Sequence, residues 1–221
     1  MRTDLSHNGG MKQLSRIPAQ RTRPDPLSKL LVKVRDCQAC REHLPLGAKP
    51  VLQAGEGARI LIAGQAPGRR AHESGIPFSD VSGDRLRAWL GVDHDTFYNA
   101  NKIALLPMGF CYPGSGKSGD LPPRPECAAL WRDRLLAQLP NIKLTLLIGQ
   151  YAQTWHIGDQ RKATLAQTVA DWQSYWPTVL PMPHPSPRNV RWLKLNPWFE
   201  QNVIPKLRLR VAEVLSGTTN Q

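Results

Sequence analysis

Four short, continuous apolar runs separated by helical patterns constrain the fold of this 221-residue sequence more than any other feature. Strands that are apolar throughout are typical of a sheet covered on both faces. Helical patterns between consecutive strands supply the crossovers that parallel strands need. The sequence therefore predicts an α/β protein, a three-layer α/β/α sandwich with a central four-stranded parallel sheet. The expected strands are 58–64, 103–109, 143–149 and 178–184, and the expected helices between them are 82–90, 128–139, 150–157 and 164–176.

The chain length suits one sizeable domain and is too short for two domains with a linker. Residues 1–26 mix basic residues and prolines without an apolar period, so they are expected to form a mobile basic arm. Residues 27–221 are expected to form a single domain. Its first helix runs from Leu27 toward Cys37, and Pro205 is expected to kink or split the amphipathic stretch near the carboxyl terminus.

The charge balance points to a polyanionic partner. Lys and Arg total 29 against 17 for Asp and Glu, which gives a formal net charge of +12. Nucleic acid is favoured over an anionic membrane surface. The sequence has no run of about 18 apolar residues and its first residues lack the apolar stretch of a secretion signal. We therefore expect a soluble, cytoplasmic protein that works as a monomer without a membrane.

Two loops at expected strand ends carry candidate chemistry. In open parallel sheets, ligands bind beyond the carboxyl ends of the strands. The first loop is GQAPG, in which Gly64 and Gly68 bracket Pro67 and let the backbone amides of Gln65 and Ala66 cradle an anionic oxygen. A glycine-proline turn of this kind is also common without any function.

The second loop, HPSPRN, begins with His184 at the end of the last expected strand. Prolines on both sides of Ser186 stiffen it and leave Arg188 and Asn189 at its tip, where they suit contact with nucleic acid. His184 is a candidate hydrogen-bond donor, although a histidine at a strand end is often only a packing residue.

A third loop, GSGKS, resembles a phosphate-binding loop but is not one. The Walker pattern requires a glycine where this chain has Cys111. Lys117 in this loop is expected to lie near DNA phosphates, or else to be simply solvated.

Together, GQAPG and HPSPRN resemble motifs A and B of the uracil-DNA glycosylase superfamily, and the resemblance extends over residues 27–215. It implies that Phe78, in the segment Gly-Ile-Pro-Phe, stacks on an extruded base. It also implies that His184 and the amides of Gln65 and Ala66 stabilise the departing base. The best-known branch has a water-orienting Asp where this chain has Ala66, so the water activator is unassigned. Asp80 is a candidate, and a helix N-cap is the alternative for it.

Cysteine spacing resembles that of the iron-sulfur branch, family 4. The pattern is C-x2-C, then 70 residues, a third cysteine, 15 residues and a fourth, formed by Cys37, Cys40, Cys111 and Cys127. The resemblance implies a [4Fe-4S] cluster with a structural role. Four thiolates also suit Zn, and residue types alone do not separate the two metals. Burial without any metal is the remaining alternative.

One position departs from family 4 and another from the classical uracil enzymes. Pro107 stands where that branch has a base-reading Asn, and Gly68 where the classical enzymes have a Tyr that excludes 5-substituted bases. HPSPRN is closer to motif B of the single-strand-selective monofunctional uracil glycosylases. Neither motif holds a lysine for a Schiff base, so strand cleavage is not expected.

The sequence thus favours a monofunctional enzyme that removes uracil from single- or double-stranded DNA and leaves an abasic site. Hypoxanthine and 5-substituted uracils are the nearest alternative substrates. The other function considered is a non-catalytic or broad-specificity binder of damaged or single-stranded DNA. An iron-sulfur electron carrier without DNA chemistry would explain the cysteines but neither the charge nor the loops.

Overall fold

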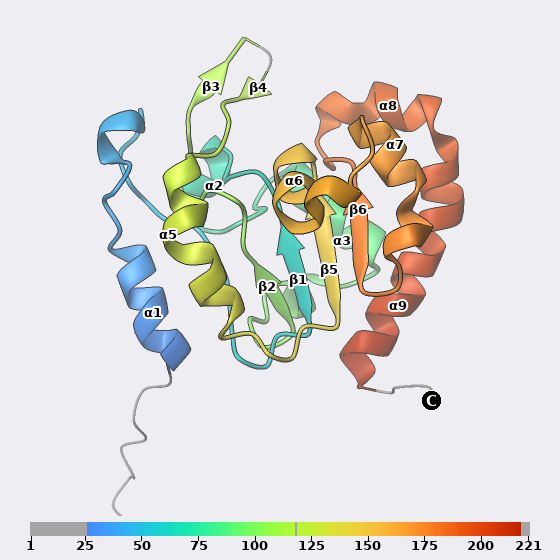
Figure 1. The fold of residues 1–221 in the computed structure, drawn as a ribbon, viewed down its shortest axis with the longest axis horizontal. Coiled ribbons are helices and arrows are strands. Elements are labelled where there is room, and N and C mark those ends of the chain that lie inside the picture. Colours follow the sequence, from blue (N-terminus) through green and yellow to red (C-terminus); the bar gives the residue numbers. More distant parts are fainter. Residues whose placement is uncertain (1–25, 118, 218–221) are drawn as a thin grey trace, which may run out of the picture.

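A computed structural model describes residues 26–117 and 119–217, and its centre is a four-stranded, all-parallel sheet (Figure 1). The strand order is β2-β1-β5-β6. In β1, Ile60 pairs with Ile103 of β2 on one side and with Leu144 of β5 on the other. The predicted α/β class and four parallel strands are confirmed. The strands are β1 Ile60–Ala63, β2 Ile103–Leu105, β5 Leu144–Ile148 and β6 Val179–Met182.

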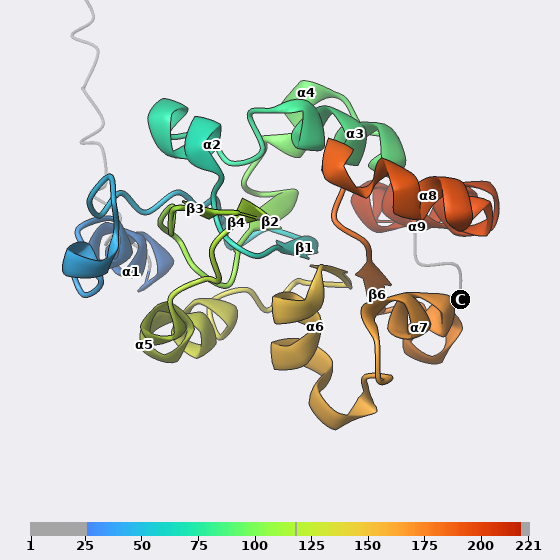
Figure 2. The same ribbon diagram turned by 90° about the horizontal axis from the view of Figure 1, so that it is seen from above.

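Helices cover both faces of the sheet, as the view from above shows (Figure 2). Alternate strand residues point to opposite faces. Ile60 and Ile62 face one helical layer, whereas Leu61 packs under the other. The layer that faces Ile60 and Ile62 contains α3 Val81–Leu90, α4 His94–Phe97, α8 Val190–Leu195 and α9 Ile204–Ser216, with α2 Arg69–Ser74 at its end. The opposite layer contains α1 Pro26–Arg35, α5 Pro125–Leu136 and α6 Gln150–Ile157, with α7 Leu165–Ala170 beside β6.

Several predicted boundaries were wrong by a few residues. The single helix predicted over 164–176 is α7 followed by a 3-10 turn at Trp172–Tyr175, with the break at Asp171, whose backbone leaves the helical region. The helix predicted to begin at 128 begins at Pro125, because proline is tolerated in a first turn. The expected split near Pro205 is confirmed: a π-helical turn at Phe199–Val203 precedes α9.

The predicted strands extend further than the observed ones at their carboxyl ends. Pairing continues there as irregular backbone bonds, in which Met108 N–H donates to Gly64 O at 2.9 Å and Gly109 N–H to Gln65 O at 3.0 Å. Beyond this edge a small antiparallel hairpin of β3 Ser115–Gly116 and β4 Gly119–Asp120 projects from the molecule (Figure 1). We call this edge, with its loops and hairpin, the carboxyl edge.

The basic arm predicted for residues 1–26 lies outside the described residues except at its last position, because α1 already begins at Pro26. Across residues 26–117 and 119–217, the helices are all too short or too polar to span a bilayer. The cytoplasmic location and the monomeric state stay predictions from the sequence.

A buried arginine fastens α5 to the end of β2. Arg132 is only 1% exposed and donates through Nη1 to the carbonyls of Leu106 at 3.0 Å and Pro107 at 3.1 Å. Its Nε donates to His156 Nε2 at 3.2 Å, and its guanidinium lies 5.0 Å from the ring centroid of Trp155. Burial, and secondarily the Arg132 charge, lower the pKa of His156 to about 3, so this imidazole is neutral and serves as an acceptor.

This pair predicts an acid-sensitive fold. Unfolded His156 takes up a proton below its ordinary pKa of 6.5, while the folded form resists protonation down to about 3. Stability is therefore complete above pH 6.5 and falls as the pH drops through this window. Between pH 7 and 4.5 we expect this residue to account for a loss of about 2.5 kcal/mol in the free energy of unfolding.

Urea unfolding at several pH values measures the effect. His156→Gln keeps an acceptor for Arg132 but does not titrate, so its pH dependence should be flatter by that amount. An identical pH dependence in both proteins would contradict the assignment.

Candidate functional site

The GQAPG loop follows β1 directly and begins the candidate site. Gly64 has no side chain, and a Cβ there would lie 3.7 Å from Cζ of Phe78, so the phenyl ring reaches the start of the loop. The side chain of Gln65 turns away to the hairpin, where Nε2 donates to the carbonyls of Asp120 at 3.2 Å and Leu121 at 2.8 Å. Gln65 therefore anchors the hairpin through its side chain, and the predicted catalytic role concerns its backbone amide.

His184 lies at the same edge, just after β6. Its Nδ1 accepts the backbone N–H of Ser186 at 3.1 Å, so the neutral ring carries its proton on Nε2. Burial lowers the pKa of His184, and the charges of Asp80 and Asp120 oppose that shift. The residue is therefore a neutral imidazole near pH 7, with Nε2–H as its remaining donor.

The rest of the HPSPRN loop is held by local bonds. Ser186 Oγ accepts the N–H of Arg188 at 3.2 Å, and Asn189 Nδ2 donates to the carbonyl of His184 at 2.9 Å. Arg85 of α3 donates to the carbonyls of Pro185 at 3.1 Å and Ser186 at 3.3 Å. These bonds fix the backbone that carries His184.

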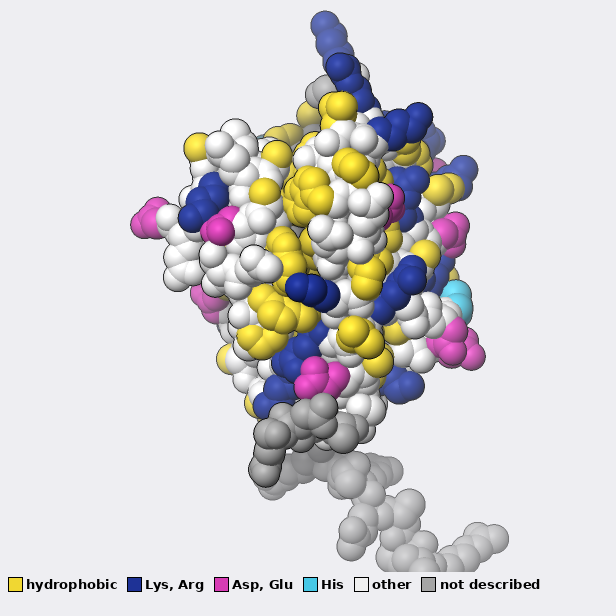
Figure 3. Space-filling model, turned by 90° about the vertical axis from the view of Figure 1, so that its right-hand side faces the viewer, with side chains coloured by type: hydrophobic (Ala, Val, Ile, Leu, Met, Phe, Trp, Pro, Cys, Tyr) yellow, Lys and Arg dark blue, Asp and Glu magenta, His cyan; other side chains and the backbone are white. Residues whose placement is uncertain are grey.

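The exposed Arg188 side chain reaches from this loop to the hairpin. A Cβ on Gly119 would lie 2.6 Å from Nη1 of Arg188, so the guanidinium rests against the bare glycine backbone. Lys117, also exposed, lies in the turn of the hairpin. Figure 3 shows Lys and Arg side chains projecting from the upper end of the molecule, the end that carries the hairpin in Figure 1.

Two carboxylates stand close enough to His184 to affect its pKa. Asp80 is the N-cap of α3 and accepts the N–H of Gly83 at 3.1 Å, so the N-cap alternative is confirmed for it. Asp120 on the hairpin accepts the hydroxyl of Ser115 through Oδ1 at 2.9 Å. A Cβ on Gly68 would lie 3.6 Å from its Oδ2.

Asp120 therefore stands between the two motif loops, although sequence reasoning missed it. The glycines and the lysine before it indicate a loop near phosphates and give no reason to single out the carboxylate. The sequence signal that could have identified Asp120 is a carboxylate directly after the glycine-rich segment that begins at Gly114.

The four cysteines form a second centre beside the first. They line one cavity together with Val34, Leu44, Pro50, Phe110, Leu130, Trp131 and other residues. Burial is the main cause that raises the pKa of the Cys40 thiol, that of Cys111 to about 11 and that of Cys127 to about 12. Without a metal these groups are protonated thiols, and a metal would have to displace their protons.

Nitrogen donors already point at the sulfur atoms. Trp131 Nε1 donates to Cys37 Sγ and the backbone N–H of Phe110 to Cys127 Sγ, both at 3.3 Å. Over the described residues, no three His, Cys, Asp or Glu side chains are grouped as they would be around a single metal ion. The cysteines instead surround a shared space.

The geometry thus brings the two motif loops, Phe78, Asp80 and Asp120 to the carboxyl edge, with the cysteine cavity nearby. A family profile described as the Uracil DNA glycosylase superfamily matches residues 53–208. The chain belongs to this superfamily. The match spans both motif loops, the hairpin, Cys111 and Cys127, but it begins after Cys37 and Cys40. Membership in the uracil-DNA glycosylase superfamily identifies the chain as a DNA glycosylase, a hydrolase that acts on DNA in repair.

Proposed function

We propose that this protein excises uracil from DNA and leaves an abasic site. The observation that carries the proposal is the bond from Ser186 N–H to Nδ1 of His184, because it leaves Nε2–H as a fixed donor at the carboxyl edge. A neutral, half-buried donor suits a base that leaves as an anion.

Cleavage of the glycosidic bond leaves positive charge on the sugar and negative charge on the pyrimidine. Preorganised donors placed where this negative charge develops lower the barrier. In our proposal His184 Nε2–H donates to a uracil oxygen, and the backbone amides of Gln65 and Ala66 share the charge. Pro67 and Gly68 keep the loop close to the base.

DNA binding is assigned to the rim of the carboxyl edge. Phe78 stacks on the extruded base, and Arg188 fills the space that the base leaves in the duplex. Lys117, Ser186 and Asn189 face the backbone of the same strand, where contacts with phosphates position DNA without reading sequence.

We assign the attacking water to Asp120. Each carboxylate has one oxygen in a local bond, Asp120 with Ser115 and Asp80 with Gly83, and both charges act on His184. Asp120 is favoured because its Oδ2 lies beside Gly68 of the motif A loop. A carboxylate in this position would orient water and stabilise the positive charge on the sugar. The Asp80 assignment stays the alternative.

Two positions at the carboxyl edge bear on the base range. Pro107 offers no side-chain donor, and its carbonyl is taken by Arg132. The space that a bulky side chain would fill at Gly68 is bordered by the Asp120 carboxylate. Neither feature selects uracil, so the choice of uracil as the main substrate rests on superfamily membership, and hypoxanthine and 5-substituted uracils are the bases to compare. Neither motif contains a lysine, which favours a monofunctional reaction.

A [4Fe-4S] cluster fits the cysteine cavity, and Cys37, Cys40, Cys111 and Cys127 would hold it. The donor set is four thiols around a shared space, with N–H groups directed at two of the sulfur atoms. The resemblance of the cysteine spacing to the iron-sulfur branch favours a cluster over a single Zn ion, which stays the alternative. The group would supply a structural link between α1, α5 and the segment after β2.

His184→Ala tests the function directly. With a uracil-containing oligonucleotide under single-turnover conditions, the variant should release base about 100- to 1,000-fold more slowly than wild type. Its Kd for DNA should change less than about threefold, because the contact strengthens only as charge develops. His43→Ala, an exposed histidine in the 3-10 turn Arg41–His43, is the matched control and should react normally.

The same assay separates the enzyme from the non-catalytic binder. Wild-type protein that shifts the oligonucleotide in a gel, but leaves it intact after alkali, would favour the binder. Strand cleavage without alkali would contradict a monofunctional reaction.

Asp120→Asn should lower the single-turnover rate about 100-fold while DNA binding is unchanged, because the amide cannot accept a proton or balance the charge on the sugar. Asp80→Asn is the matched control: it also removes a carboxylate near His184, and Asn still caps α3. The reverse pattern, with Asp80→Asn impaired and Asp120→Asn active, would assign the water to Asp80.

Protein purified without oxygen should absorb broadly in the visible range and contain about four iron atoms per chain. Cys111→Ser should lose both signals and melt at a lower temperature, because the link after β2 is broken. One zinc per chain without visible absorption would assign the site to Zn. Neither metal in wild-type protein would leave four unligated thiols and contradict both.

A further inference from the structure

The backbone of Phe78 has a conformation that residues with a side chain rarely adopt. Its φ is 54°, in the left-handed region, and it is the only described residue other than glycine with a positive φ. Such a conformation persists only when the surroundings impose it. The ring that is assigned to base stacking therefore sits on a backbone that needs external support.

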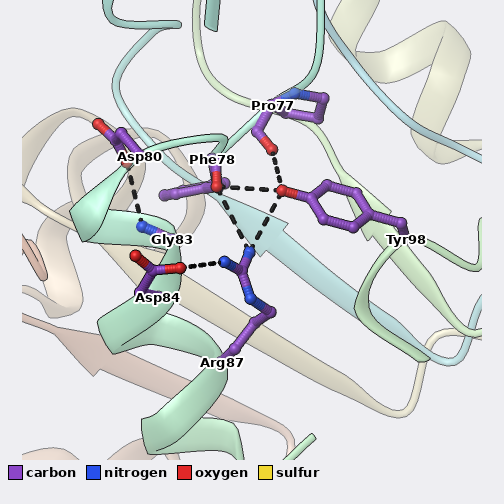
Figure 4. A network of polar contacts seen from close by, with 7 residues as sticks. All are labelled: Pro77, Phe78, Asp80, Gly83, Asp84, Arg87 and Tyr98. Atoms are coloured by element: carbon purple, nitrogen blue, oxygen red, sulfur yellow. Dashed lines mark hydrogen bonds and ion pairs between the residues drawn. The ribbon is translucent and has the colours of Figure 1, made fainter. Parts of the chain in front are cut away.

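That support comes from two side chains outside both motif loops (Figure 4). The hydroxyl of Tyr98, just after α4, lies 3.0 Å from the carbonyl oxygens of both Pro77 and Phe78. Arg87 of α3 donates through Nη1 to Phe78 O at 3.4 Å and to the Tyr98 hydroxyl at 3.2 Å. Burial raises the pKa of Tyr98, so the phenol keeps its proton.

Three further contacts fix the guanidinium of Arg87. Arg87 pairs with Asp84 one turn earlier in α3, as Figure 4 shows. Its cation also lies 5.4 Å from the ring centroid of Phe97 and 5.6 Å from that of Tyr98.

Close packing against Gly83 of α3 also fixes the position of the Phe78 carbonyl. A Cβ on Gly83 would lie 1.8 Å from Phe78 O, so the turn sits directly on the bare backbone of α3. The ring itself then points at Gly64, and meets Phe97 edge to face with centroids 6.2 Å apart. The position of the carbonyl and the direction of the ring are thus set together.

We propose that Tyr98 and Arg87 are positioning residues for base capture: they lock Phe78 in the left-handed conformation that aims its ring at the motif A loop. They act through the Phe78 carbonyl and do not touch the substrate. This inference rests on the proposed function, since Phe78 is the stacking residue there. Its consequence is that capture of the base depends on a tyrosine hydroxyl and an arginine that belong to neither motif.

Tyr98→Phe tests the proposal because it removes only the hydroxyl. Tyr175→Phe is the matched control, since the Tyr175 hydroxyl also donates to a backbone carbonyl, that of Gln160 at 2.6 Å, away from the carboxyl edge. Both variants are first compared with wild type by circular dichroism and thermal melting. A folded Tyr98→Phe should lose about 10-fold in the single-turnover rate, and Tyr175→Phe should lose none.

A double-mutant cycle with Phe78→Ala separates positioning from a general structural role. Phe78→Ala alone should lose about 10- to 100-fold, and adding Tyr98→Phe should cost less than about twofold more, because the ring that Tyr98 aims is gone. Equal losses from Tyr98→Phe in both backgrounds would overturn the proposal. So would equal rates for Tyr98→Phe and Tyr175→Phe.

A second readout needs no activity. The chain contains only four phenylalanines, so fluorine NMR of protein labelled with 4-fluorophenylalanine gives a small set of signals. The signal absent from Phe78→Ala identifies that ring. It should shift or broaden in Tyr98→Phe and not in Tyr175→Phe, with the Phe110 and Phe199 signals unchanged.

An unmoved Phe78 signal in Tyr98→Phe would overturn the positioning role. Failure of wild-type protein to release uracil would instead refute the proposed function, while the fluorine spectra would still decide whether Tyr98 holds the ring.

Discussion

The parallel pairing of β1 with β2 on one side and β5 on the other is the constraint on which the site depends. All four strands run the same way, so every strand leaves its following loop at one edge. Ile60 and Ile62 are fully buried, as the central position of β1 requires, and this burial fixes the register of the GQAPG loop. Residues 64 and 184, far apart in the chain, lie at the same edge because of this alignment, with β5 between their strands.

A short segment after β2 joins the two centres of the molecule. Its amides at Met108 and Gly109 hold the carbonyls of the motif A loop, and its next amide, at Phe110, donates to the sulfur of Cys127. Arg132 holds the start of the same segment from α5. A few consecutive peptide groups therefore connect the cysteine cavity with the motif A loop.

The sequence was sufficient to predict the fold class and the two motif loops, because both depend on local patterns: apolar runs, helical periods, and glycine or proline at strand ends. The roles of Asp120 and Tyr98 depend on contacts between distant segments. The Gln65 side chain donates to the Asp120 carbonyl, 55 positions away in the chain. The Tyr98 hydroxyl contacts the Phe78 carbonyl, and α3 lies between these two residues in the chain. Periodicity carries no information on such contacts. The break at Asp171 is not predicted because the helical pattern of the sequence continues across it. Here the local pattern is present but the chain does not follow it.

The chain carries a net positive charge, whereas the candidate donor in the site is neutral, and this difference suits a reaction on DNA. The net charge of +12 attracts the phosphate backbone without distinguishing one base from another. The donor that we propose for the base is instead the neutral imidazole of His184, whose pKa is lowered by burial. An imidazolium would bind phosphate anywhere along the strand as well as a departing base, whereas a neutral Nε2–H interacts most strongly once negative charge has formed on the base. In our proposal the half-buried His184 and the exposed Arg188 separate catalysis from attraction within one six-residue loop.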